Sequence, residues 1–135
     1  MMLKSIVGAL AVAAFILALA AGLRLAQGLE MLDADAARRT MQVTVGLILA
    51  AYANFMPKEI GRWPASARAA ARSQSALRVG GWSMTLAGLA HAGIWAFAPI
   101  AFANIAAMLV VAAATLVTMG YGGWTLLSCR RTAAR

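Results

Sequence analysis

Few residues in this 135-residue chain are of a type that does chemistry. It has one histidine, His91, and one cysteine, Cys129, and a metal site needs several such ligands close together. It also has neither a Ser–His or Asp pair suited to intramembrane proteolysis nor an HExxH motif. The sequence therefore predicts no catalytic residue and no metal site, and it favours a non-enzymatic protein.

His91 lies in the second half of an apolar stretch, with Trp95 one helical turn later. A histidine in a membrane helix can ligate haem or chlorophyll, or it can hydrogen-bond a neighbouring helix. We expect the interhelical contact, because a haem held by two histidines needs a second histidine that this chain lacks. No cofactor is therefore predicted, and a haem or chlorophyll contact at His91 is the alternative.

His91 and Cys129 belong to a chain that is dominated by four apolar stretches. They run from Ser5 to Leu25, from Met41 to Met56, from Val79 to Phe97 and from Ile100 to Leu127. A helix rises about 1.5 Å per residue, so about 20 residues cross the roughly 30 Å hydrocarbon layer of a bilayer. Hydrophobic residues make up 63% of the chain, and its mean hydropathy is +0.79. We therefore expect an all-α fold, with residues 1–135 forming one polytopic membrane domain, an antiparallel bundle of four transmembrane helices.

The basic residues are divided unequally between the two sides of such a bundle. Nine of the twelve fall in the N-terminus, the loop 57–78 and the C-terminal tail: Lys4, Lys58, Arg62, Arg68, Arg72, Arg78, Arg130, Arg131 and Arg135. Because Lys and Arg are retained in the cytoplasm, both termini and this loop are predicted to be cytoplasmic. The net charge of +8 then reflects multi-pass topology in a bacterial inner membrane rather than nucleic-acid binding.

The loop 57–78 is predicted to contact lipid head groups. Trp63 suits the membrane interface, and Arg68 and Arg72 are four residues apart in an alanine-rich, helix-prone segment. Each basic residue near an anionic surface adds about 1 kcal/mol of binding. A patch for a partner protein or a nucleic acid is the alternative, and membrane contact is the simpler interpretation.

Two features predict where helices begin and end. Asp33 or Asp35 is placed to cap the helix that contains the second stretch. The segment Phe97-Ala98-Pro99 is the only link between the third and fourth stretches, so these should form a tight antiparallel hairpin.

Ionisable and amide side chains are scarce within the stretches. Apart from Arg24, near the end of the first, no charged residue lies in the middle of any stretch, which disfavours a proton-coupled exporter. Asn54 and Asn104 are expected to bond backbone or hydroxyl groups such as those of Thr44, Thr85 or Thr115, with a substrate contact as the alternative.

The end of the second stretch resembles a motif of the SdpI family of small bacterial membrane proteins. Asn54-Phe55-Met56-Pro57-Lys58 is similar to the Asn-x-x-Pro-Lys element that ends a span in that family. The family's basic, glycine-containing loop and next helix have similar pieces here, namely Ile60-Gly61-Arg62, Arg78-Val79-Gly80-Gly81-Trp82 and Gly88-Leu89. The likeness covers roughly residues 54–89.

This resemblance implies an inner-membrane protein of the bacteriocin-immunity type. Some members of the family protect against a secreted toxin and signal by sequestering a repressor. The resemblance then makes a cytoplasmic motif the candidate site: Asn54, Pro57, Lys58, Arg62 and Arg78.

Two other functions remain open from the sequence. One is an accessory subunit of a larger respiratory or photosynthetic complex, which fits the small extramembrane portion and His91. The other is a small channel or transporter that oligomerises around Asn104, Thr115 and Thr118. In each case the expected partners are the lipid bilayer and either another membrane protein or further copies of this chain.

Overall fold

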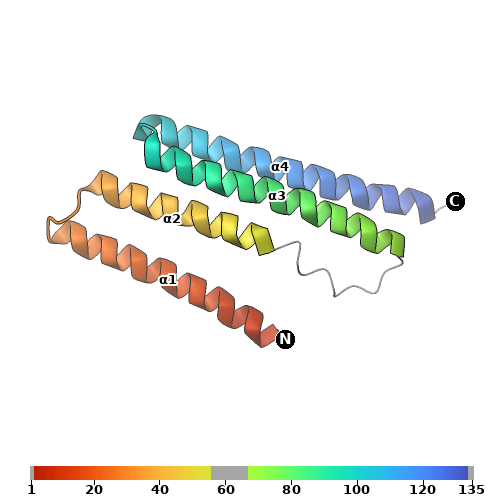
Figure 1. The fold of residues 1–135 in the computed structure, drawn as a ribbon, viewed down its shortest axis with the longest axis horizontal. Helices are drawn as coiled ribbons and strands as arrows, with labels where there is room; N and C mark the ends of the chain where they lie inside the picture. The colour runs from red at the N-terminus through yellow and green to blue at the C-terminus, as the bar shows by residue number, and fades with distance from the viewer. Residues whose placement is uncertain (1, 56–66, 134–135) are drawn as a thin grey trace. The chain divides into compact units, whose positions relative to one another are not determined.

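The computed structural model describes residues 2–55 and 67–133, and in these ranges it contains four α-helices and no strand (Figure 1). Their bounds are α1 Met2–Gly28, α2 Ala34–Phe55, α3 Ala67–Phe97 and α4 Ile100–Ala133. The predicted all-α class is confirmed. Pro57, Lys58, Arg62 and Trp63 lie outside the described residues.

Within the described ranges, two helices contain a segment long and apolar enough to cross a membrane. These segments are Ile6–Gly28 in α1 and Ile100–Thr125 in α4. The other two helices begin with charged turns, α2 with Asp35, Arg38 and Arg39 and α3 with Arg68 and Arg72. Those charges shorten the apolar part of α2 and α3.

The turn between α1 and α2 is held by backbone hydrogen bonds and by one cap. The amides of Met31 and Glu30 donate to the carbonyls of Ala26 and Gln27, at 3.0 and 3.1 Å, and Glu30 is left-handed with φ of 57°. This is the Schellman pattern that ends many helices. Asp33 then caps α2, since its Oδ1 accepts from the amide of Ala36 at 2.6 Å. Of the two acids expected as caps, Asp33 takes this place.

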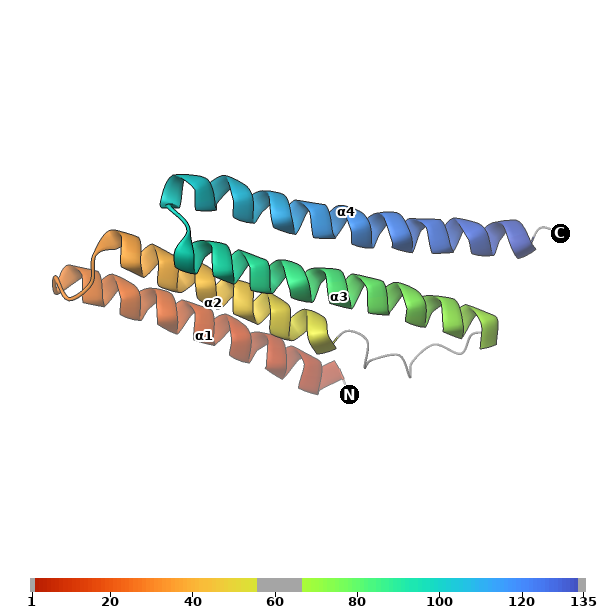
Figure 2. The ribbon, with the colours of Figure 1, turned by 45° about the horizontal axis from the view of Figure 1, so that its top comes forward.

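The hairpin predicted at residues 97–99 is confirmed. The amide of Ala98 donates to the carbonyl of Ile94 at the end of α3, and that of Ala103 donates to the carbonyl of Pro99 at the start of α4, both at 2.9 Å. Figures 1 and 2 show α3 and α4 side by side along their length, and they pack against each other.

The helix α3 begins well before the apolar stretch that starts at Val79. It starts at Ala67, so residues 67–78, expected as part of a loop, form its first three turns. The physical reason is the composition of this segment, in which alanines and arginines have high helix propensity. Arg68, Arg72 and Arg78 are therefore carried on a helix.

The chain forms two compact units, residues 1–41 and 42–135, and the division falls inside α2. The second unit has a core of small side chains around one tryptophan. Its buried hydrophobic residues are Ala50, Ala53, Ala87, Ala92, Trp95, Ala103, Ala107 and Ala114. Large apolar side chains of α4 face outward instead, for example Ile105, Leu116 and Met119. Soluble proteins bury such side chains, whereas membrane helices meet through small residues, so the pattern favours a lipid environment.

Candidate functional site

A close helix contact in the second unit joins Gly46 of α2 to Gly88 of α3. A Cβ atom on Gly46 would lie 2.8 Å from the backbone nitrogen of Ala92 and 2.8 Å from the carbonyl oxygen of Gly88. A Cβ on Gly88 would lie 2.6 Å from the backbone nitrogen of Ala50. These distances are much shorter than ordinary van der Waals contacts, and the atoms approached belong to the backbone, so only glycine fits at either position.

Hydrogen bonds flank this contact on both sides. One turn toward the start of α2, His91 Nε2 lies 3.2 Å from Gln42 Oε1. One turn in the other direction, Thr85 Oγ1 lies 3.5 Å from the carbonyl of Ala50 and donates to that of Gly81 at 2.7 Å. The glycine contact and the polar contacts together hold α2 and α3 in one register.

The side chain of His91 is half-buried in this packing. The Nε2–H tautomer of His91 can donate to the amide oxygen of Gln42, which only accepts. The other nitrogen, Nδ1, is buried and has no hydrogen-bond partner in the described part of the chain. A cofactor metal would have to displace Gln42 or open the helix contact to reach this ring. Among the described residues there is also no cluster of three His, Cys, Asp or Glu side chains that could hold a metal ion.

A second set of polar contacts joins α3 to α4. Ser75 Oγ lies 2.8 Å from the hydroxyl of Tyr121, and Ser83 Oγ lies 3.1 Å from Thr118 Oγ1. Gly80 faces the same threonine, since a Cβ there would lie 2.9 Å from Thr118 Cγ2. Thr118 and Thr115 also donate to carbonyls of their own helix, at 2.8 Å each. Both threonines therefore use their hydroxyls within the packed helices.

The register of α2 against α3 brings two pieces of the candidate motif to the same end of the pair. Contacts pair residues 42 with 91, 46 with 88 and 50 with 85, so the helices run antiparallel. The next turn puts Asn54 at the level of Gly81, beside the segment 78–82. Asn54, Arg78 and Trp82 are exposed, whereas Gly80 and Gly81 are buried.

The structure adds two residues to those singled out from sequence. Gln42 and Gly46 were not predicted to take part in a site, although both complete contacts to His91 and Gly88. Arg68 and Arg72 lie in the first two turns of α3, and Asn104 lies exposed on α4. Comparisons with protein-family models, with curated proteins and with solved structures find no match to this sequence.

Proposed function

We propose that this chain is a small, non-enzymatic, multi-pass protein of a bacterial inner membrane that works by binding another protein or peptide. The binding surface is the cytoplasmic end of the α2–α3 pair, which carries Asn54 and the segment Arg78–Trp82. This is the role of an immunity or signalling protein similar to the SdpI family.

The observation that carries the proposal is the helix register. Asn54 and the segment 78–82 are separated by a long stretch of sequence, yet both belong to the motif that resembles the SdpI family, and the pairing of residues 46 and 88 brings them to one level. A motif assembled from two helices at one end of a pair is what a binding surface requires.

The binding surface is held in place by the contacts between α2 and α3. Gly46 and Gly88 fix the distance between the two backbones, and the Gln42–His91 hydrogen bond fixes their rotation. Asn54 can then offer an amide, Arg78 a guanidinium and Trp82 a large aromatic face from backbone that is already ordered before binding, which leaves only the side chains to be ordered. Tryptophan and arginine are the side chains most enriched where binding energy is concentrated.

The membrane part of the proposal is supported by composition and packing. Two helices have apolar segments of membrane-spanning length, the core of the second unit consists mainly of alanine, and large apolar side chains of α4 face outward. The unequal distribution of Lys and Arg supports four spans with both termini in the cytoplasm.

Site-specific photocrosslinking in living cells tests the binding surface. A photoreactive amino acid at Trp82 should crosslink to a protein or peptide, and the same group at Phe97, exposed at the far end of α3, should not. Replacing Asn54 by Ala and Arg78 by Gln should remove the Trp82 crosslink. Equal crosslinking at both positions, or insensitivity to the two substitutions, would contradict the proposal.

The accessory-subunit alternative has less support from the geometry of His91. Both ring nitrogens are covered, one by Gln42 and the other by packing. Purification in a mild detergent separates the two functions, because co-migration with a haem or pigment complex would favour the subunit. The channel alternative is weakened by Thr115 and Thr118, whose hydroxyls bond within the packed helices.

A further inference from the structure

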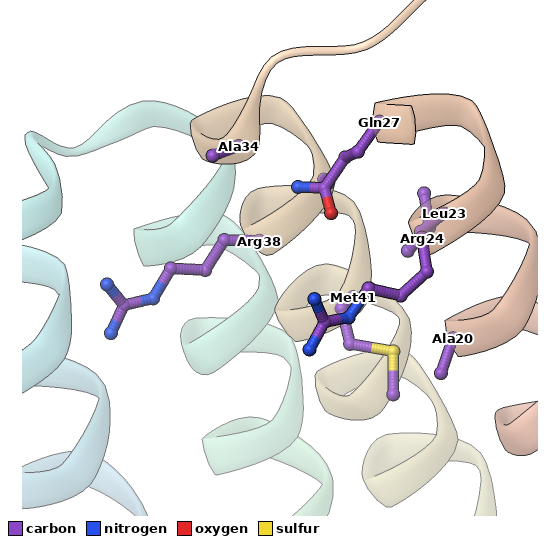
Figure 3. A pocket seen from close by; sticks show the side chains of 8 residues that line it. Ala20, Leu23, Arg24, Gln27, Ala34, Arg38 and Met41 are labelled. Atoms are coloured by element: carbon purple, nitrogen blue, oxygen red, sulfur yellow. The ribbon is translucent and has the colours of Figure 1, made fainter. Parts of the chain in front are cut away.

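A pocket lies between the last turns of α1 and the first turns of α2, entirely within residues 1–41 (Figure 3). Its volume is about 230 Å³. Its polar lining comes from Arg24 and Gln27 of α1 and Arg38 of α2, and its apolar lining includes Leu23 and Met41. All the residues that line the pocket come before Asn54 and the segment 78–82 in the chain. A function of this pocket therefore does not depend on the binding surface proposed for the α2–α3 pair.

The polar side chains give the pocket a positive character. Arg24 and Gln27 are one helical turn apart, and Figure 3 shows both extending from α1 toward α2. The guanidinium of Arg38 points away from Arg24 in the same view, and its side chain is exposed, so it adds positive charge at the edge of the pocket. None of the described residues that line the pocket is acidic.

The position of Arg24 suits an anionic ligand. It lies near the end of the apolar segment Ile6–Gly28, and a charged side chain at such a place needs a partner or access to the head-group region. A guanidinium offers five N–H donors in a planar fork, which suits the oxygens of a phosphate. The amide of Gln27 supplies further donors one turn away.

The size of the pocket limits the ligand. Pockets for drug-sized molecules are roughly 300–1,000 Å³, so about 230 Å³ is enough for a single head group. Leu23 and Met41 provide an apolar side for the carbon atoms next to it. We propose that this pocket binds a phosphate group, held by Arg24 and Gln27 with Arg38 adding positive charge, as carried by an anionic phospholipid or by inorganic phosphate.

Native mass spectrometry of the full chain tests this site. The protein is released from micelles that contain equal amounts of phosphatidylglycerol and phosphatidylcholine, and the retained lipid is counted. We expect preferential retention of phosphatidylglycerol. The Arg24→Gln variant should reduce the preference for phosphatidylglycerol at least about tenfold, the effect of a lost charge-assisted hydrogen bond. The Arg38→Gln variant should reduce this preference by less than about fivefold, because Arg38 contributes only charge near the surface. Arg39→Gln is the matched control and should change nothing, because Arg39 does not line the pocket.

Two further arms complete the test. Inorganic phosphate at millimolar concentration should leave the lipid bound if the phosphate comes from a phospholipid, and should displace it if the site takes free phosphate. Arg24→Lys keeps the charge but loses the planar fork, so it should fall between wild type and Arg24→Gln while the helical circular dichroism stays unchanged. Two results would overturn the proposal. In the first, the wild-type protein retains both lipids equally and binds no inorganic phosphate. In the second, the Arg24→Gln variant keeps the wild-type preference for phosphatidylglycerol.

Discussion

At the scale of single residues, Gly46 and Gly88 set the distance between α2 and α3. Each would place a Cβ atom within 2.8 Å of backbone on the facing helix, and backbone cannot move aside as a side chain can. Gln42 and His91 add a hydrogen bond one turn away. These four residues set the spacing and register of α2 and α3, the two helices that carry Asn54 and the segment 78–82.

Gly88→Ala is expected to destabilise the protein by about 1–3 kcal/mol, the usual cost of forcing an extra methyl group into a closed contact. Gly93→Ala is the matched control on the same helix, since a Cβ at Gly93 would meet nothing within 4 Å. That control should be neutral or stabilising by up to about 1 kcal/mol, because alanine is the better helix former. Unfolding by SDS in mixed micelles measures the free energy of unfolding of both variants. Equal changes for Gly88→Ala and Gly93→Ala would rule out the close contact at Gly88.

Gln42 and His91 should be energetically coupled. A double-mutant cycle with Gln42→Ala and His91→Ala is expected to give a coupling of about 1 kcal/mol, the scale of hydrogen bonds between membrane helices. The single changes should each cost more than the coupling alone, because each leaves a polar group without its partner. A coupling free energy of zero would mean that the 3.2 Å contact does not stabilise the pair.

At the scale of elements, α3 is one continuous helix that joins a basic segment to an apolar one. It spans Ala67–Phe97, and its partner α4 packs against it through Gly80, Ser83 and Thr118. Arg68 and Arg72 therefore turn with the apolar part of the helix as a single body. A substitution that breaks the helix in the basic segment should therefore also destabilise the apolar segment.

Ala76→Pro tests this continuity. Proline in a helix interior removes a hydrogen bond and clashes with the preceding turn, at a cost of about 3 kcal/mol. Ala67→Pro is the control, because proline is tolerated at the first helical position. Helical circular dichroism and the free energy of unfolding should fall for Ala76→Pro alone. If Ala76→Pro left both unchanged, residues 67–78 would not be a continuous part of α3.

The helices were easier to predict than their contacts. The turn at residues 97–99 and the cap by Asp33 depend on local residues, so they could be predicted from the sequence. The helix-prone character of the segment around Arg68 and Arg72 could also be predicted, but its continuity with the stretch from Val79 could not, because an apolar stretch marks only the part of a helix suited to lipid. The pairing of Gly46 with Gly88, or of Gln42 with His91, depends on the register of two helices, which no local pattern in the sequence determines.

At the scale of the whole molecule, the distribution of side chains argues for a bilayer as the solvent. The core of the second unit is mainly alanine, with Trp95 as its large member, and the large apolar residues of α4 lie outside it. A soluble protein would leave a hydrophobic surface of this kind open to aggregation. Lipid would cover it at no such cost, and in the proposed topology the basic residues would determine which side of the membrane each turn faces.

Labelling by a membrane-impermeant maleimide tests this topology most directly. In a Cys129→Ala background, one variant carries Met31→Cys, in the exposed turn between α1 and α2, and the other carries Gln74→Cys, in the basic part of α3. The proposed topology predicts that intact spheroplasts label Met31→Cys at once and Gln74→Cys only after lysis. Labelling of Gln74→Cys from outside intact cells, or recovery of the chain in the soluble fraction without detergent, would contradict it.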